Sequence, residues 1–536
     1  MQLVKLPPNS KVAVIGAGIS GLSFSYFLSK LRPDLKIKIY ESKNRCGGWI
    51  NSARTKLNTN SNKTGGEILL EKGPRTLRGV SDGTVLIIDI LQKLGLENEI
   101  KCIESNSEAN KKYILDVNKK LCQVPPTGLK SFLHFITNPM SKGLLTGILG
   151  EPFRSPSKVQ DETAYDFLKR RFGNTYIADN LFSAIFHGIY AGDIKQLSVN
   201  CTLNKLAQME KDYGSILRAV YHKRNAKPEK SLVLSQYNEK FCGNSAEIDE
   251  ISQLNTFLSK YPALGLKNGL STLPNSLESY ILKNPNVEIQ YGKHIENFKL
   301  LNHDKTNAQK KAAVELDGGK ELFDHIHITV PTAKLFSKCE NIDKDFILKL
   351  EKLKSASVIL VNYYLPNKDV IFRNHGFGYL VPQSVTNHES LLGVIFDSCI
   401  EQSFQPLFGA RSEIPSPNPP YTKLTAMLGA NHSFVDSLST AAVDNAGVPS
   451  PSLVKGIVKE CFKEHLGIDE KDLENGHWEV TLASNAIPQY YVGYNHTDLE
   501  SKLPLNVVTV GGMKFSKGPG VPDVVVKSFE TALGLA

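Results

Sequence analysis

The 536-residue sequence lacks several features that would assign it to common classes of protein. No run of eighteen apolar residues occurs, so no transmembrane helix is predicted. The eight cysteines form no C-x-x-C pair and no histidine–cysteine metal spacing, and we expect reduced core residues and no metal site. The 63 basic and 54 acidic residues are spread along the chain. Their net charge of +9 favours an anionic surface or an acidic ligand over nucleic acid.

A targeting leader and a conventional catalytic set are also missing. The ten residues before the first predicted strand are too few for a secretory signal and form no Arg-rich presequence, so we expect any address to be internal. No Ser/His/Asp set or paired carboxylate stands out. His325 and His327 share one face of a predicted half-exposed strand, but no third metal ligand accompanies them. The expected source of chemistry is therefore a cofactor.

What the sequence does contain begins near its N-terminus. Residues 11–15 predict a buried strand, residues 16–21 form the G-x-G-x-x-G turn, and an apolar helical pattern follows as far as Leu31. Residues 36–40 predict a second strand that ends at Glu41, at the spacing of a carboxylate that holds a ribose hydroxyl. This arrangement predicts a dinucleotide site whose contacts are Gly16, Ala17, Gly18, Ile19, Ser20, Gly21 and Glu41.

The segment after the second strand distinguishes between cofactors. Ser42 is followed by Arg45-Cys-Gly-Gly48-Trp49, and Glu-x-x-x-Arg-x-Gly-Gly resembles the flavin amine oxidase-like superfamily, in which it continues the FAD site. A Gly73-Pro74-Arg75-Thr76 turn follows a further predicted strand at 67–71. Such a turn either brings backbone and a guanidinium against a flavin or is an ordinary solvated Pro/Gly turn.

Three separated motifs carry a closer resemblance that covers nearly the whole chain. Gly16–Trp49, Gly73–Gly79 and Gly188–Ser198 are similar to those of the protoporphyrinogen oxidases, especially their fungal mitochondrial forms. The resemblance implies oxygen-dependent oxidation of protoporphyrinogen IX on non-covalent FAD, in three two-electron steps that yield hydrogen peroxide. It also implies a peripheral place on the mitochondrial inner membrane, with neighbouring haem-pathway enzymes or a second copy as candidate partners.

The resemblance also suggests site residues. It implies substrate contacts at Gly188, Leu380, Ile395, Met427 and Arg75, although the first four fit ordinary core packing as well. Further cofactor contacts are implied at Ser42, Arg45, Gly48, Trp49, Gly73, Pro74, Arg75, Thr76, Ile295, Met513, Val521, Pro522 and Asp523. Either Arg75 or Arg78 could hold a carboxylate of the substrate. No basic residue occurs in 79–92, where some members carry an arginine, so the partner of the substrate carboxylates stays open.

These patterns predict an α/β protein of several domains. A Rossmann-like FAD-binding domain is assembled from the discontinuous segments 1–85, 262–300 and 478–536. Residues 86–210 form a helical membrane-associating region, whose apolar stretches at 125–139 and 142–153 fit either an interfacial segment or an internal core. Residues 211–261 are a polar insertion or linker. Residues 301–477 form an α+β substrate domain with a mostly antiparallel sheet.

Two other functions stay open at this point. A different FAD-dependent oxidase, acting on an amine or a polyene, would share the N-terminal fingerprint but not the Gly-Ile-Tyr-Ala-Gly-Asp run at 188–193. A non-catalytic flavin-binding scaffold would hold FAD without turnover.

Overall fold

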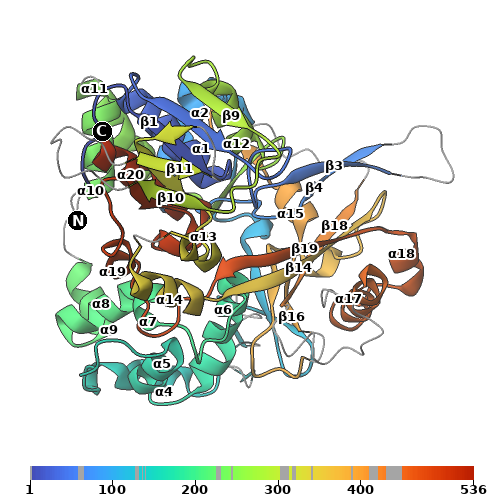
Figure 1. The fold of residues 1–536 in the computed structure, drawn as a ribbon. Helices are drawn as coiled ribbons and strands as arrows, with labels where there is room; N and C mark the ends of the chain where they lie inside the picture. The colour runs from blue at the N-terminus through green and yellow to red at the C-terminus, as the bar shows by residue number, and fades with distance from the viewer. Residues whose placement is uncertain are drawn as a thin grey trace.

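A computed structural model describes most of the chain. The described residues are 3–57, 66–126, 132–133, 135, 137–138, 141–224, 231–242, 245–301, 313–316, 321–339, 342–387, 390–409, 420–429 and 450–536. In Figure 1 a nucleotide-binding-type lobe lies at the top, a long antiparallel sheet crosses the middle, and a group of short helices fills the lower left. No helix in these ranges is long and apolar enough to cross a membrane.

The upper lobe is built on a five-stranded parallel sheet. Its order is β20 (Val508–Val510), β13 (His325–Ile328), β1 (Lys11–Ile15), β2 (Lys36–Tyr40) and β9 (Val287–Gln290). One face is covered by α1 (Ile19–Leu31), α2 (Asp82–Lys93), α12 (Thr272–Ile281) and α20 (Val521–Leu535). The other is covered by β10 (Phe298–Leu301), β11 (Ala313–Leu316), β12 (Leu322–Phe323), α13 (Ala333–Ser337) and α14 (Lys344–Lys352). The predicted strand–turn–helix–strand unit at 11–40 is confirmed.

The second lobe is organised by a seven-stranded sheet. Its order is β19 (His477–Pro488), β14 (Ser355–Leu365), β18 (Thr422–Gly429), β16 (Leu391–Ile395), β15 (Gly378–Leu380), β6 (Lys112–Leu115) and β7 (Leu121–Gln123). All its neighbours are antiparallel except β15 and β6, which confirms the mostly antiparallel sheet. One face packs on α17 (Pro451–Leu466), beside α18 (Glu470–Asn475).

Sheet membership corrects the predicted domain boundaries. β13 lies inside the predicted substrate segment, yet it pairs with β1 and β20 in the parallel sheet. Because it is a central strand, both of its histidines are fully buried rather than half exposed. β19 lies inside the predicted FAD segment but pairs with β14, and β6 and β7 lie inside the predicted helical region. The chain therefore crosses between lobes more often than predicted.

The predicted polar linker at 211–261 is wrong in the parts that the structure describes. It contains the end of α8 (Asn204–Tyr213), then α9 (Ile216–Lys223), α10 (Leu232–Phe241) and α11 (Ser245–Leu258). Tyr237 of α10 and Leu258 of α11 are fully buried in the core of the parallel-sheet lobe. The outer faces of these helices are mostly polar. Their apolar side is therefore evident only once they are seen packed against the parallel-sheet lobe.

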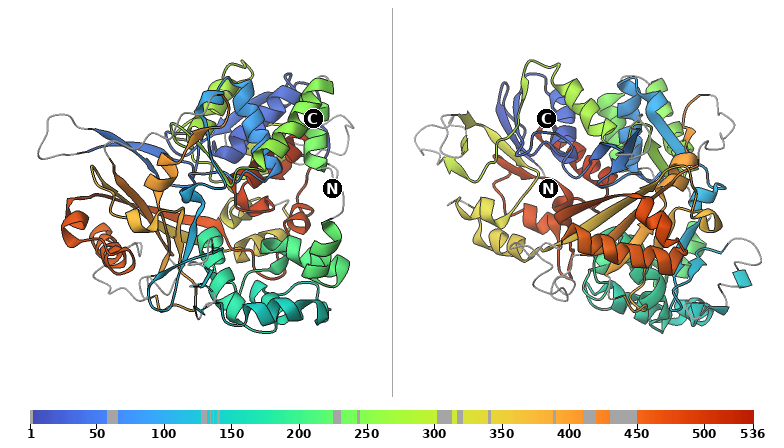
Figure 2. Two further views of the ribbon diagram at one scale, coloured as in Figure 1. Left: turned by 180° about the vertical axis from the view of Figure 1, so that it is seen from behind. Right: turned by 90° about the vertical axis from the view of Figure 1, so that its right-hand side faces the viewer.

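Smaller elements connect the lobes. The hairpin β3 (Ser52–Lys56) and β4 (Glu67–Glu71) extends sideways in Figures 1 and 2. A three-stranded sheet joins β17 (Gln405–Pro406), β5 (Ile100–Ile103) and β8 (Ala263–Leu266). Other α-helices among the described residues are α4 (Leu144–Gly150), α5 (Ala164–Phe172), α6 (Ser183–Tyr190), α7 (Val199–Thr202), α15 (Asp397–Gln402) and α19 (His496–Glu500). Much of the apolar stretch at 125–139 lies outside the described residues.

Candidate active site

The glycine turn after β1 has the geometry of a dinucleotide cradle. Gly16 adopts φ +102°, and a Cβ on Gly21 would lie 2.0 Å from the Gly16 carbonyl oxygen, so both positions exclude a side chain. Helix α1 begins at Gly18 with no capping side chain and no acidic residue in its first turn. Its first N–H groups and the helix dipole are thus available to an anion such as a pyrophosphate.

Glu41 lies beside this turn, as predicted. The carboxylate is buried; its Oε2 accepts a hydrogen bond from the Ala17 N–H at 2.8 Å, and its Oε1 accepts one from the Lys43 N–H at 2.9 Å. Ser42 Oγ lies 3.4 Å from the same Oε1. The contact between a carboxylate at the end of β2 and the turn after β1 is the arrangement expected around a ribose.

Arg45 supports the Gly47–Trp49 loop by hydrogen bonds to its backbone. Its guanidinium donates to the carbonyls of Cys46, Gly48 and Ile50 at 2.8, 2.7 and 3.2 Å. The Gly47 N–H donates to the Ala17 carbonyl at 2.9 Å, which places the loop against the glycine turn. The donors of Arg45 are thus used to shape the loop, and its predicted FAD contact would have to share them.

The Gly73–Thr76 turn lies against the same loop, because a Cβ on Gly73 would be 2.0 Å from the Trp49 carbonyl oxygen. Arg75 forms a buried ion pair with Asp397, whose Oδ2 accepts from Thr425 Oγ1 at 2.7 Å. The charge of Arg75 is therefore compensated inside the protein, which argues against its predicted role with a substrate carboxylate. Asp397 is 322 residues away in sequence and was missed, because no local pattern marks it.

The C-terminal segment closes the site from the other side. The Gly512 N–H donates to Ser20 Oγ at 3.0 Å, which joins the turn after β20 to the first turn of α1. Helix α20 begins at Gly520 without a capping side chain, and Asp523 stands in its first turn with a pKa raised by burial. Met513 precedes this helix. Ile295 follows β9, is partly buried and packs against the core on the β10–β12 side of the sheet.

These segments fit FAD. The strands β1, β2, β13 and β20 are parallel, so the turns that follow them meet at one edge of the sheet. At that edge lie the N-termini of α1 and α20, neither of which has a capping side chain. The glycine turn lies there as well, and a Cβ would fill its concave side. This set suits a long cofactor with a pyrophosphate and an electron-accepting ring.

The predicted substrate residues share one face of the large sheet. In the strand register, Leu380 is opposite Gly393 and Gly393 is opposite Met427, while Ile395 stands two residues further along β16. Residues two apart on a strand point the same way, so all three side chains lie on the face away from α17. A Cβ on Gly188 would lie 2.7 Å from Leu380 Cδ2, which brings α6 against this face.

Tyr190 and Arg78 belong to the same region. Arg78 was an alternative to Arg75 as partner of a substrate carboxylate, whereas Tyr190 was given no role from the sequence. The Tyr190 ring is buried, 6.3 Å from the Tyr490 ring, and burial raises the pKa of its hydroxyl to about 12. Arg78 and Asp523 act electrostatically on that hydroxyl. Tyr190 stands within the Gly-Ile-Tyr-Ala-Gly-Asp run, the one signal that could have identified it.

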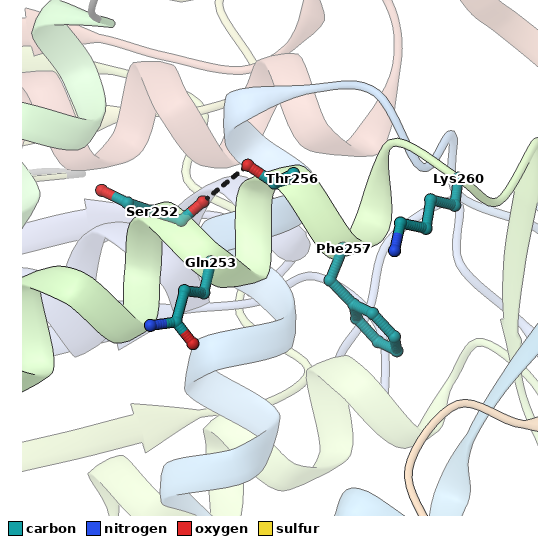
Figure 3. Close-up of a pocket in the computed structure, with 5 residues that line it drawn as sticks. All are labelled: Ser252, Gln253, Thr256, Phe257 and Lys260. Atoms are coloured by element: carbon teal, nitrogen blue, oxygen red, sulfur yellow. Dashed lines mark hydrogen bonds between the residues drawn. The ribbon is translucent and has the colours of Figure 1, made fainter.

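The surface hollow of about 380 Å³ drawn in Figure 3 is unrelated to this site. It is lined by Ser252, Gln253, Thr256, Phe257 and Lys260 around α11. Thr256 Oγ1 donates to the Ser252 carbonyl at 3.1 Å within the helix. The five side chains form no cluster of reactive groups.

Comparison with known proteins is consistent with these features. The profile described as flavin containing amine oxidoreductase matches residues 19–518. The chain is 42% identical to protoporphyrinogen oxidase of Saccharomyces cerevisiae over 100% of this chain and 99% of the relative. It is 27% identical to human protoporphyrinogen oxidase over 98% of each chain. A solved structure from Exiguobacterium sp. 255-15 shares the fold, with a TM-score of 0.66, 17% identity and 98% of each chain covered.

Proposed function

The chain belongs to the flavin containing amine oxidoreductase family, and on that premise we propose that it oxidises protoporphyrinogen IX to protoporphyrin IX. The observation that carries this proposal is the 42% identity with the yeast enzyme, which extends over the whole of both chains. The cofactor is FAD, held without a covalent bond. The reaction consumes three molecules of oxygen and releases three of hydrogen peroxide, and it is the penultimate step of haem biosynthesis.

Bound FAD supplies the hydride acceptor. The protein supplies position: the glycine turn after β1 and the start of α20 hold the cofactor, and the apolar face with Leu380, Ile395 and Met427 provides a flat surface for the macrocycle. Gly188 keeps α6 in contact with that face, because any larger residue would push Leu380 away. The pyrrole N–H proton leaves to solvent.

An amine or polyene oxidase is less well supported. The three predicted substrate side chains on this face, Leu380, Ile395 and Met427, are all apolar, which suits a macrocycle better than a charged amine. A scaffold without turnover is less well supported than an enzyme because the 42% identity is with an oxidase and extends over the whole of both chains.

The test is to purify the protein in detergent, record its visible spectrum and add protoporphyrinogen IX in air. Flavin absorbance, porphyrin fluorescence that rises faster than in buffer, and three peroxides for each porphyrin would support the proposal. Flavin bands with oxidation of an amine or polyene instead would favour the alternative oxidase. Flavin bands without any turnover would favour the scaffold.

We also propose that one apolar surface docks on a membrane. Leu145 and Leu149 of α4 and Phe153 after it are 70%, 72% and 85% exposed, and they recur every four residues. Val220 and Tyr221 of α9 are 52% and 74% exposed. Figure 1 shows α4 at the lower edge and α9 above it at the lower left, both below the parallel sheet. This membrane-facing patch, made of these five residues, is too apolar for an ordinary solvated surface.

The patch is held rigidly and has a basic rim. Glu151 is fully buried, pairs with Arg171, and accepts hydrogen bonds from Ser215 Oγ and the Ile216 N–H at the start of α9. This carboxylate therefore fixes α9 against the end of α4. Exposed cations lie close in sequence to the patch residues: Lys142, Arg218, Lys223 and Arg224. A bilayer with anionic lipid matches both the apolar centre and the charged rim.

Vesicle binding tests the docking proposal. Leu149→Glu/Phe153→Glu should reduce sedimentation with cardiolipin-containing vesicles at least tenfold, because two side chains that enter the interface become charged. Phe372→Glu, which changes a 61% exposed phenylalanine on the other lobe, is the matched control. Equal binding by all three proteins would refute the docking surface. Residence on the mitochondrial inner membrane, contacts with haem-pathway enzymes and a homodimer stay predictions, and subcellular fractionation tests the first.

A further inference from the structure

Two neighbouring carbonyls between β20 and α20 are held by tyrosine hydroxyls from the segment that follows β19. The Tyr490 hydroxyl donates to the Met513 carbonyl at 2.5 Å, and the Tyr494 hydroxyl donates to the Lys514 carbonyl. Met513 is a predicted FAD contact, and both carbonyls belong to the short helical turn Met513–Phe515. Because peptide units are planar, hydrogen bonds to two successive units leave this turn little freedom to rotate.

The segment that carries the tyrosines is attached to the helical part of the molecule. The Ser198 N–H at the start of α7 donates to the Tyr490 carbonyl at 2.8 Å. Cys201 Sγ of α7 donates to the Tyr494 carbonyl at 3.4 Å. The Tyr490 ring is buried, 6.3 Å from the ring of Tyr190 at the end of α6 and 5.4 Å from that of Tyr494. Backbone and ring contacts therefore fix both hydroxyls relative to α6 and α7.

The same turn has separate contacts with the FAD-binding lobe. Immediately before it, the Gly512 N–H donates to Ser20 Oγ in the first turn of α1 at 3.0 Å. Lys514 Nζ donates to the Pro331 carbonyl, shortly after β13, at 3.4 Å. The turn therefore joins the first helix and the end of β13 to the tyrosines of the helical part.

Peptide geometry determines which groups this turn presents. In a trans peptide unit the C=O and the following N–H point in opposite directions. Because the Met513 carbonyl is directed at Tyr490, the Lys514 N–H points away from that tyrosine. Ser516 Oγ also lies 3.1 Å from the Met513 carbonyl, but its single proton has a closer acceptor in the Gly518 carbonyl at 2.6 Å. Tyr490 is thus the donor that fixes the direction of this peptide unit.

Resting on the proposed function, we propose that Tyr490 and Tyr494 are positioning residues for bound FAD. Each hydroxyl donates its proton to a backbone carbonyl, so it acts through the turn and not on the cofactor. The tyrosines keep two carbonyl oxygens, which carry partial negative charge, directed toward themselves rather than toward the electron-accepting ring. A reduced flavin carries additional electron density, so a carbonyl that turned toward it would disfavour reduction.

Removal of the two hydroxyls tests this inference. Tyr490→Phe/Tyr494→Phe keeps both rings, so the core should stay packed while the visible circular dichroism of the bound flavin changes. FAD released on dilution of the holoenzyme should give a Kd about tenfold higher than that of wild type, the effect of losing two hydrogen bonds of ordinary strength. The kcat for protoporphyrinogen IX should fall. Its KM should stay within about twofold of wild type, because Leu380, Ile395 and Met427 are unchanged.

Tyr363→Phe is the matched control. The Tyr363 ring is fully buried in the core on the α17 side of the large sheet, and its hydroxyl donates to the Asp472 carbonyl at 3.0 Å. This variant loses the same kind of hydrogen bond, so its thermal midpoint should fall. The spectrum of its flavin and its Kd for FAD should equal those of wild type.

The flavin measurements decide the inference without a porphyrin substrate. A wild-type flavin spectrum and a wild-type Kd for FAD in the double variant would overturn it, and so would the same changes in Tyr363→Phe. If the double variant does not fold, Tyr490→Phe alone decides in the same way. A wild-type protein that holds FAD but does not oxidise protoporphyrinogen IX refutes the proposed function, and the flavin measurements then still test the two tyrosines.

Discussion

Lowering the pH from 7.5 to 5.5 should destabilise the protein through two buried histidines on β13. Thr509 Oγ1 lies 2.8 Å from His325 Nε2 and 3.0 Å from His327 Nδ1, and both rings are fully buried. Burial lowers the pKa of His325 to about 4 and that of His327 well below its ordinary value. Protonation of His327 would place a proton on both ring nitrogens, and the buried Nε2 has no hydrogen-bond partner among the described residues.

The sign follows from the order of the two pKa values. The unfolded chain takes up protons near pH 6.5, whereas the folded protein does so only near pH 4 or below. Stability is therefore complete above pH 6.5 and falls as the pH falls through that window. Each histidine costs about 1.3 kcal/mol between pH 7.5 and 5.5, so the pair costs about 2.6 kcal/mol. That is a substantial part of the stability of an ordinary protein.

Urea unfolding of the FAD-bound protein, followed by far-UV circular dichroism at both pH values, measures this loss. His325→Gln keeps a polar side chain but removes one titrating group, so its loss should be smaller than that of wild type by about 1.3 kcal/mol. His222→Gln, at an exposed position, should behave as wild type. Buried carboxyls such as Glu71, whose pKa burial raises, act in the opposite direction but cancel in this comparison. A His325→Gln protein with the full pH dependence of wild type would refute the argument.

Three further outcomes are expected. Gly21→Ala should weaken FAD binding at least tenfold, because the new Cβ would lie 2.0 Å from a backbone oxygen; the ratio of flavin to protein absorbance measures this, and normal flavin content would contradict it. Gly188→Ala should lower kcat/KM, and the additional change Leu380→Ala should recover activity, because the added methyl meets the Leu380 side chain; failure of the double variant would count against that contact. Asp397→Asn should destabilise the fold by about 3 kcal/mol because it leaves Arg75 buried and unpaired, and Arg75→Met/Asp397→Leu should regain most of it; equal thermal midpoints for both variants would exclude this cause.

Local chemistry made the N-terminal unit predictable. The strand at 11–15, the helix at 19–31 and the strand at 36–40 were predicted with the bounds that the structure shows. Each is set by neighbours in sequence: a β-branched run, a glycine turn, an apolar period and a Pro-Asp break. Glu41 could be placed for the same reason, since the length of one strand–helix–strand unit brings the end of β2 beside the turn after β1.

Sheet membership could not be predicted in the same way. β13 and β19 have ordinary strand sequences, and nothing within them states whether they join the parallel or the antiparallel sheet. That choice depends on partners far away in the chain, such as the pairing of Ile326 with Val508. The helix α10 shows the same limit. Its Tyr237 ring packs on Phe529 of α20, and without that contact the segment resembles a solvated linker.

A comparison of three arginines shows that residue type alone does not identify the side chain that is available to a ligand. Arg45, Arg75 and Arg78 all stand close to glycine turns in sequence, and all are chemically suited to bind an anion. The fold uses the first to fix a loop through three carbonyls and the second to neutralise Asp397, so neither retains a full set of donors for a ligand. Arg78 differs because its backbone, rather than its guanidinium, makes the structural contacts. A charged side chain that the fold does not use for its own contacts keeps its donors for a ligand, and that distinction exists only in three dimensions.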